Sequence, residues 1–329
     1  MPQALERISG KVVVVGSLNA DLTVVTQRLP LPGETVSGEG LRILPGGKSA
    51  NQAVQAALLG AEVHMVGAVG EDGNGEILRQ SLKAARVNQD FVHSISVSTG
   101  TALITVDKSG ENTIVVSPGA NGLVDATLVA EAEELIASAD TLGLCLEIPY
   151  EAVFEAARIA NKHQTKVVFN FSPILPVSDE LWPLIDVLAV NEHELAEVLR
   201  STKILRSQAL SVEDEEELSF EPQDMRCWEI ARQKLSEIGI SQAVITLGSA
   251  GSVVIEPEEI SILEACVTTA VDTTGCGDAY MATLLAGLAS SFSLKDSSRL
   301  AAMVAAYAAG GEGAQNSYGR SKEIIRQFS

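Results

Sequence analysis

The stretch DTTGCGDAY, residues 272–280, places two glycines and an aspartate directly before the apolar run MATLLAGLA. It follows the β-prone run ACVTTAV, so the sequence predicts a strand, a glycine turn and then a helix. The first amides of such a helix have no intrahelical partner and carry partial positive charge. Gly275 and Gly277 would let a ligand approach the backbone closely. We therefore expect an anion site at residues 275–277, suited to charge that develops on a transferring phosphoryl group.

Asp278 falls in the first turn of this expected helix, beside those amides. A carboxylate at that place can take the proton from a substrate hydroxyl as the hydroxyl attacks. Aspartate is also common in the first helical turn because it complements the helix dipole. The motif alone leaves both interpretations open, and the neighbouring glycines and the motifs below favour the catalytic one.

The motif PGGKSANQA, residues 45–53, has some likeness to a P-loop, but the position of the first P-loop glycine is occupied by Arg42. The run VVVVGSLNADL has one glycine where the dinucleotide fingerprint needs three. What remains at 45–53 is a Gly-Gly turn that opens a helix, in which Lys48 and Asn51 could hydrogen-bond to a polyol. An ordinary helix start is the alternative.

Three further motifs follow expected strands, at the edge where open parallel sheets bind ligands. Asn19 and Asp21 come after the strand at 11–16 and would fit vicinal hydroxyls, although both residue types also form turns. Asn191 and Glu194 lie three apart at a helix start, either as a cap or to organise water and Mg²⁺ around a nucleotide. The loop TLGSAG at 246–251 could admit nucleotide phosphates or be only a β-turn.

The composition restricts the partners of the chain. Its 329 residues carry 23 Lys and Arg against 43 Asp and Glu, a net charge of −20 that repels nucleic acid and anionic membrane surfaces. Any phosphate site must therefore be made locally. The four cysteines form no CxxC pair, the N-terminus has no signal-peptide core, and no apolar run approaches the roughly 18 residues of a membrane span. We expect a cytoplasmic protein with reduced thiols.

Helix and strand patterns alternate from about residue 123 onward, which predicts an α/β fold with a parallel sheet. The segment 201–225 interrupts this alternation and contains an unbroken acidic run at 213–217. We interpret it as a solvated, partly disordered surface insertion.

The motifs GSLNAD, GGKSANQA, CLEIP, NEHE, TLGSAG, DTTGCGDAY and GGEGAQNS, in this order, resemble the ribokinase family of PfkB-type carbohydrate kinases. The resemblance covers nearly the whole chain except 201–225. It implies a single three-layer α/β/α domain over residues 1–329, with a central, mostly parallel sheet. It also implies a small β-sheet lid from about 22–29, 36–44 and 101–117, whose exposed apolar face suggests a homodimer.

The activity that the resemblance implies is ATP-dependent phosphorylation of D-ribose at O5, with Mg²⁺ and activation by K⁺. A kinase for 2-deoxyribose, another sugar or a nucleoside is the alternative within the enzyme class. A catalytically silent sugar-binding protein and a scaffold that acts through the acidic insertion are alternatives outside it. Asp278 and the glycines beside it count against the silent protein.

The resemblance further implies roles for individual residues. The base would be Asp278, and the anion hole would consist of the amides of Gly275, Cys276 and Gly277. The sugar contacts would be Asn19, Asp21, Gly46, Gly47, Lys48, Asn51, Glu147 and Asp278. The nucleotide and its Mg²⁺ would involve Asn191, Glu194, Thr246, Gly248, Gly251 and Gly277. The K⁺ loop would comprise Asp272, Thr274, Ala308, Gly311, Gly313 and Ser317.

Two residues depart from the family pattern. Ser49 replaces the third glycine of GGKGAN, and its hydroxyl would either cap the helix or narrow the sugar pocket. Cys276 replaces the alanine of DTTGAGD, and a thiol beside the phosphate path would make the enzyme sensitive to oxidation.

Overall fold

The computed structural model of the chain describes residues 2–201 and 220–329. The acidic run 213–217 and most of the expected insertion at 201–225 therefore lie outside the described residues. No helix in the described ranges is long and apolar enough to cross a membrane.

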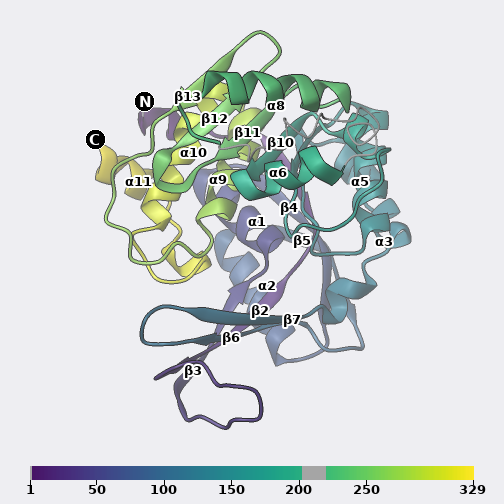
Figure 1. Cartoon of the computed structure of the whole chain (residues 1–329). Helices are drawn as coiled ribbons and strands as arrows, with labels where there is room; N and C mark the ends of the chain where they lie inside the picture. Colours follow the sequence, from purple (N-terminus) through teal and green to yellow (C-terminus); the bar gives the residue numbers. More distant parts are fainter. Residues whose placement is uncertain (1, 202–219) are drawn as a thin grey trace.

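The main sheet of the described chain has nine strands in the order β13-β12-β11-β10-β9-β8-β1-β4-β5 (Figure 1). The strands from β5 to β11 in this order pair in parallel, while β12 and β13 add an antiparallel edge. Their bounds are β1 Lys11–Val15, β4 Glu62–Gly70, β5 Asn88–Ile95, β8 Thr141–Leu144, β9 Lys166–Asn170, β10 Val187–Asn191, β11 Ala243–Thr246, β12 Ser252–Ile255 and β13 Ile260–Leu263.

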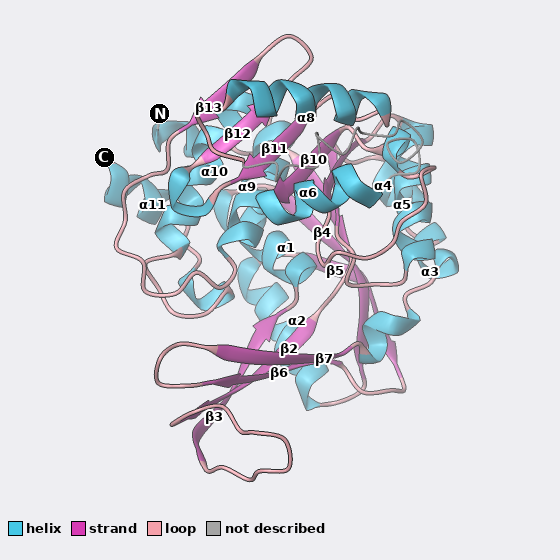
Figure 2. Cartoon of the chain, in the orientation of Figure 1, coloured by secondary structure: helices cyan, strands magenta, loops and turns pink. Residues whose placement is uncertain are grey.

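Helices cover both faces of this sheet (Figure 2). The first face carries η1 Pro2–Arg7, α1 Lys48–Leu59, α2 Gly73–Ala85, α9 Cys276–Ala289, α10 Leu294–Ala308 and α11 Ser321–Phe328. The second carries α3 Ala126–Ala130, α4 Glu133–Ala137, α5 Tyr150–His163, α6 Glu192–Ser201 and α8 Met225–Glu237.

Strand β1 shows why its sequence, KVVVV, produces a three-layer fold. Val12 and Val14 pack into the core under the first set of helices, whereas Val13 and Val15 pack into the core under the second. Successive side chains of a strand point to opposite faces, so a continuous β-branched run suits a strand that is covered on both sides. The predicted α/β/α class is confirmed.

A second, four-stranded sheet in the order β3-β2-β6-β7 projects from the main body (Figures 1 and 2). We call it the small sheet, and its strands are β2 Asn19–Thr26, β3 Gly38–Gly46, β6 Gly100–Val106 and β7 Asn112–Ser117. Strand β2 begins four residues after β1 ends, and β3 ends two residues before α1 begins. Asn19 and Gly46 therefore lie in strands of the small sheet, although the sequence indicated turns at these two residues of the predicted sugar motifs.

Candidate active site

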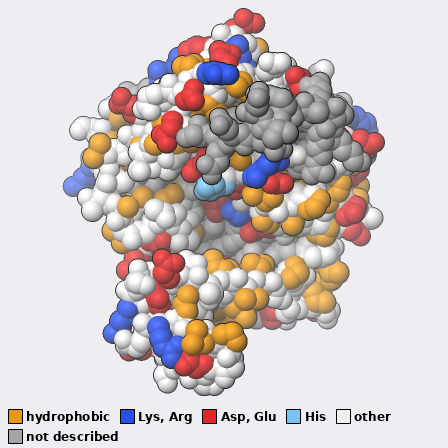
Figure 3. Space-filling view, in the orientation of Figure 1, with side chains coloured by type: hydrophobic (Ala, Val, Ile, Leu, Met, Phe, Trp, Pro, Cys, Tyr) orange, Lys and Arg blue, Asp and Glu red, His pale blue; other side chains and the backbone are white. Residues whose placement is uncertain are grey.

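A cavity of about 250 Å³ lies between the carboxyl ends of β9, β10 and β11 and the N-terminus of α9. Figure 3 shows the molecule hollowed between the main body and the small sheet, with charged side chains inside the hollow. The cavity is lined by Lys48, Asn170, Ser172, Ala189, Val190, Asn191, Glu194, Val244, Thr246, Thr273, Gly275, Gly277, Asp278, Tyr280 and Met281. It thus joins residues from four of the predicted motifs.

Asp278 lies in the first turn of α9 and is only 7% exposed. Its Oδ2 accepts a hydrogen bond of 2.8 Å from Asn51 Nδ2, and its Oδ1 accepts one of 3.5 Å from Gln52 Nε2. Burial raises the pKa of Asp278, while the charge of Lys48 and the bond from Asn51 act in the opposite direction. The result is a buried carboxylate that opens onto the cavity and is more basic than an exposed one.

Lys48, at the start of α1, is surrounded by carboxylates. Burial by itself would lower the pKa of Lys48, but the charges of Asp278 and Glu147 outweigh it and raise that pKa. Glu147 Oε2 also accepts hydrogen bonds from the Lys48 amide at 2.9 Å and from Ser17 Oγ at 2.5 Å. Residues of α1, α9 and the loop after β8 therefore meet at one charged cluster.

Asp21 joins this cluster from the small sheet. Burial, Glu147 and Asp278 together raise the pKa of Asp21 to about 7. Gly46 makes room for it, because a Cβ on Gly46 would lie 2.2 Å from Asp21 Oδ2. Residues of the predicted sugar set from four separate motifs are thus brought together, with more carboxylates than cations.

This raised pKa predicts an unusual dependence of stability on pH. Asp21 binds its proton more tightly in the folded protein, so its stabilising contribution is complete below its unfolded pKa and is lost as the pH rises through about 7. Asp21→Asn should therefore raise the thermal unfolding midpoint at about pH 8 and change it little at about pH 4.

Asp107, in the β6–β7 turn, supplies the contrast for this prediction. Its pKa is lowered, chiefly by hydrogen bonds from Ser109, so its contribution exists above its unfolded pKa and is lost in acid. Asp107→Asn should lower the midpoint at about pH 8. If both variants shift the midpoint in the same direction at that pH, the charged environment assigned to Asp21 is wrong.

Asn19 and Asn121 form a buried pair beneath the small sheet. Asn121 Nδ2 donates to Asn19 Oδ1 at 2.8 Å, and the Asn121 side chain also bonds both backbone groups of Leu18. Gly47 has φ +89°, and a Cβ there would lie 2.7 Å from the Asn19 amide nitrogen. Asn121 was not among the predicted site residues, because a single asparagine in the segment GAN gives no sign that it bonds a residue about a hundred positions away.

The predicted anion hole is only partly open. Gly275 adopts a left-handed conformation, with φ +76°, and its carbonyl accepts a hydrogen bond from Tyr318 Oη at 2.9 Å. The Cys276 amide, which the motif led us to expect facing outward, instead donates to the Thr273 carbonyl at 3.2 Å. Gly275 and Gly277 line the cavity, and a Cβ on Gly277 would meet no protein atom within 4 Å. These two glycines thus present backbone to the cavity.

Asn191 and Glu194 cap α6 and also line the cavity. The Asn191 amide donates to Glu194 Oε2 at 2.9 Å, and the Glu194 amide donates to Asn191 Oδ1 at 2.8 Å. Both interpretations of NEHE are therefore compatible with the structure.

The loop TLGSAG contributes one residue to the cavity. Thr246 lines the cavity, whereas Gly248 and Gly251 lie in the following turn and do not. Gly251 has φ +100°, and a Cβ there would lie 2.1 Å from the Leu263 carbonyl oxygen, which explains that glycine without a ligand.

The residues of the predicted cation loop lie in two neighbouring segments. Asp272 ties the segments together, because its Oδ1 accepts from the Thr274 amide and its Oδ2 accepts from the Gly313 amide. Ala308 and Gly311 are joined by a backbone hydrogen bond, and Ser317 Oγ donates to the Ala314 carbonyl. The potential ligands are all oxygens, which suits a hard cation.

Ser49 neither caps α1 nor lines the cavity. Its fully buried hydroxyl lies 3.1 Å from Cys145 Sγ, in space that Gly16 leaves open, since a Cβ on Gly16 would come within 2.0 Å of Ser49 Oγ. The N-cap residue of α1 is Gly47, and no side chain caps the helix. Both expectations for Ser49 are therefore wrong, because its rotamer directs the hydroxyl into the core beneath the site.

The surroundings of Cys276 bear on its predicted sensitivity to oxidation. Burial, Asp272 and Asp278 raise the pKa of its thiol to about 11, so the reactive thiolate is disfavoured. This environment opposes the oxidation sensitivity expected from the sequence, which stays a prediction.

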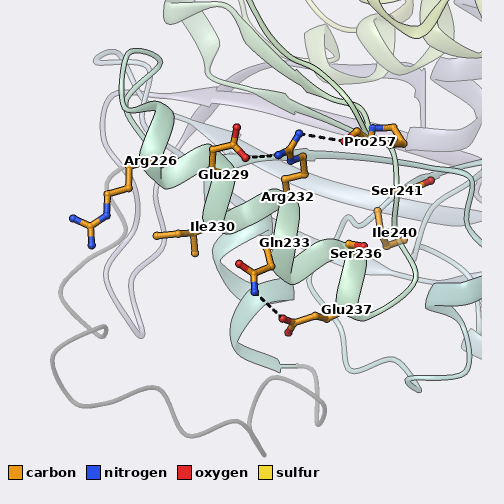
Figure 4. A pocket seen from close by; sticks show the side chains of 10 residues that line it. All are labelled: Arg226, Glu229, Ile230, Arg232, Gln233, Ser236, Glu237, Ile240, Ser241 and Pro257. Carbon is orange, nitrogen blue, oxygen red and sulfur yellow. Dashed lines mark hydrogen bonds and ion pairs between the residues drawn. The ribbon is translucent and has the colours of Figure 1, made fainter.

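A second hollow, of about 640 Å³, lies beside α8 (Figure 4). Arg232 donates a hydrogen bond to the Pro257 carbonyl and forms an ion pair with Glu229, and Gln233 Nε2 donates to Glu237 Oε1. It contains none of the predicted site residues.

Comparison with known proteins places the chain among sugar kinases. A model described as pfkB family carbohydrate kinase matches residues 9–319. Ribokinase of Schizosaccharomyces pombe is 38% identical over 327 residues, which are 97% of this chain and 98% of that protein. The structure of Arabidopsis thaliana ribokinase complexed with ribose and ATP has a TM-score of 0.84 at 29% identity, covering 97% of this chain and 98% of that one. Ribokinase from Thermotoga maritima has a TM-score of 0.83 at 27% identity, with 97% and 99% coverage.

Proposed function

Because the chain belongs to the pfkB family of carbohydrate kinases, we propose that it transfers the γ-phosphoryl group of ATP to O5 of D-ribose. The observation that carries the proposal is the position of Asp278, a buried carboxylate at a helix N-terminus in the same cavity as Lys48 and the backbone of Gly277. Relatives named ribokinase over nearly the full length, and the likeness to a structure with ribose and ATP, support ribose as the sugar.

The proposed chemistry follows from the charges around Asp278. Its carboxylate takes the proton of the sugar hydroxyl as that oxygen attacks the γ-phosphate. Burial makes the carboxylate a stronger base, while Lys48 and Asn51 favour its ionised form. The amides of Gly275 and Gly277 then stabilise the charge on the transferring group.

Two cations belong to the proposal. Mg²⁺ would be held with the nucleotide phosphates near Glu194, whose carboxylate lines the cavity, and would neutralise phosphate charge. K⁺ would be held by carbonyl and side-chain oxygens of the two segments that Asp272 joins. We also infer a cytoplasmic location, in keeping with four free cysteines.

The sugar pocket favours a small polar substrate over a nucleoside. Asp21, Lys48 and Glu147 supply charged hydrogen-bonding groups close together, and a purine or pyrimidine would need an apolar or aromatic wall instead. The test is ADP release with ATP, Mg²⁺, K⁺ and a panel of ribose, 2-deoxyribose, hexoses and nucleosides, compared by kcat/KM. Ribose binding by calorimetry without any turnover would favour the silent sugar-binding protein.

We further propose that the small sheet closes over the sugar and pairs with a second copy. Ile43, Leu22, Leu103 and Val115 are directly opposite one another across the four strands, so their side chains share a face. Asp21 precedes Leu22 and points to the other face, toward the site. Leu103 is 50% exposed and Val115 is 64% exposed. An apolar row on the far side of the sheet suits a two-fold contact between lids.

Leu103→Asp should convert the proposed dimer to a monomer, because it places a charge in the middle of that row. The measurement is mass by sedimentation or light scattering at micromolar protein. Ile114→Asp is the matched control, since Ile114 is 54% exposed on the neighbouring strand but lies on the opposite face. A dimer that survives Leu103→Asp, or that Ile114→Asp disrupts equally, rules this interface out.

A further inference from the structure

Four polar side chains form a hydrogen-bonded chain that ends at Asp278. Ser81 Oγ, on α2, donates to Gln315 Oε1 at 2.5 Å. Gln315 Nε2 donates to Asn51 Oδ1 at 3.0 Å. Asn51 Nδ2, on α1, donates to Asp278 Oδ2 at 2.8 Å. The chain connects α2, α1 and α9 with η5, Gln315–Ser317, and each hydrogen bond in it is donated toward Asp278.

The direction of this chain follows from the carboxylate at its end, because an ionised carboxylate accepts hydrogen bonds and donates none. An asparagine side chain has a donor end and an acceptor end, so its orientation decides which end faces a carboxylate. Gln315 occupies the acceptor end of Asn51, and Ser81 in turn occupies the acceptor end of Gln315. The ionised Asp278 carboxylate only accepts hydrogen bonds, so Asn51 presents its NH₂ group to Asp278 and its oxygen to the NH₂ group of Gln315. The Ser81 hydroxyl can donate or accept, so it completes the chain without setting its direction. Turned over, Asn51 would place an oxygen against that carboxylate and leave Gln315 facing a second donor.

We propose that Gln315 is a positioning residue for the catalytic base: through Asn51, it orients the hydrogen bond that stabilises the ionised carboxylate of Asp278. The inference rests on the proposed function, which assigns the role of base to Asp278. Gln315 belongs to the C-terminal loop between Gly313 and Ser317. The conformation of that loop therefore influences Asp278 through one intervening side chain, the amide of Asn51.

Little else can replace the bond from Asn51. The other amide donor, Gln52, is 3.5 Å away, which is the weak limit of a hydrogen bond. Among the described residues, the titratable groups that interact electrostatically with Asp278 include Asp21, Lys48, Glu147, Cys276 and Tyr318. Among these only Lys48 is a cation. Loss of the Asn51 donor would therefore raise the pKa of Asp278 beyond its already elevated position.

The test compares two substitutions at Gln315 of similar size. Gln315→Glu has only acceptors, so it draws the Asn51 NH₂ group toward itself and turns the Asn51 oxygen to Asp278. Gln315→Met makes no hydrogen bond and leaves Asn51 free to adopt either orientation. The profile of kcat/KM for the sugar against pH reports groups of the free enzyme, which is the state described here. We expect Gln315→Glu to move its acidic limb upward by about one pH unit, and Gln315→Met to move it less.

Asn316→Asp controls for the added charge, because residue 316 is exposed on the same turn and takes no part in the chain of bonds. It should leave the acidic limb in place, and thermal unfolding should show all three variants folded. An unmoved limb in Gln315→Glu, or an equal shift in Asn316→Asp, overturns the inference. A wild-type protein without sugar-dependent ADP release would instead overturn the proposed function, so the two failures are distinguishable.

Discussion

Asp278→Asn should lower kcat by about 10²–10⁴-fold with the fold intact, because it removes the proposed base while preserving the shape of the side chain. Asparagine can keep one contact to Asn51 or Gln52, but it cannot accept a proton from the attacking hydroxyl. The measurement is sugar-dependent ADP release under saturating ATP and Mg²⁺. Full activity in the variant would refute the role assigned to Asp278.

The same substitution should make the protein more stable at neutral and alkaline pH. The pKa of Asp278 is raised by burial, so the wild-type protein loses stability as the pH rises through that pKa. Asparagine carries no charge to bury, and its unfolding midpoint should exceed that of the wild type at about pH 8. Loss of activity with a gain of stability distinguishes a functional carboxylate from one that only supports the helix.

Asp296→Asn is the matched control. Asp296 is also in the first turn of a helix, α10, but it is exposed and does not line the cavity. If Asp278 served merely to complement the helix dipole, the two substitutions would have similar effects, each costing at most about 1 kcal/mol of stability with activity retained. We expect that behaviour from Asp296→Asn alone.

The site residues that could be predicted from the sequence are those that follow the end of a predicted strand. Asp21 after β1, Glu147 after β8, Asn191 at the end of β10 and Thr246 at the end of β11 all reach one edge because the strands are parallel. A run such as KVVVVG identifies the strand, and the glycines beside the polar residues identify the turn. The strands and turns could therefore be predicted from local patterns, whereas the family and its three-layer fold followed from the resemblance of the ordered motifs.

The supporting contacts could not be predicted in this way. Gln315 and Asn51 are 264 residues apart, and Asn51 and Asp278 are 227 apart, so no local pattern relates them. The direction of the Ser49 hydroxyl likewise depends on space left by Gly16, a residue of a different motif. Side chains that orient other side chains depend on rotamers and packing, which spacing in the sequence does not encode.

Gly277→Ala should reduce activity while it leaves the fold intact, so it tests the anion site more directly than the other glycine substitution proposed below. Gly277 is the second residue of α9 with an ordinary helical φ, and a Cβ there meets open space at the cavity. Alanine is the better helix former by up to about 1 kcal/mol, so the variant should be as stable as the wild type or more stable. Its methyl group, however, would stand where a phosphate oxygen must approach the backbone, and kcat/KM should fall by about 10²-fold.

Gly275→Ala provides the comparison two residues earlier. Gly275 has φ +76°, and a Cβ there would lie 2.6 Å from Ala314 Cβ and 2.8 Å from Tyr318 Oη, so this variant should lose stability and activity together. The decisive measurement is therefore the pair of thermal midpoints beside the pair of kcat/KM values. Wild-type kcat/KM in a stable Gly277→Ala protein would mean that phosphate does not reach these amides. The charge on the transferring group would then be stabilised by the Lys48 ammonium and bound cations, since the other described residues that line the cavity carry carboxylates or neutral groups.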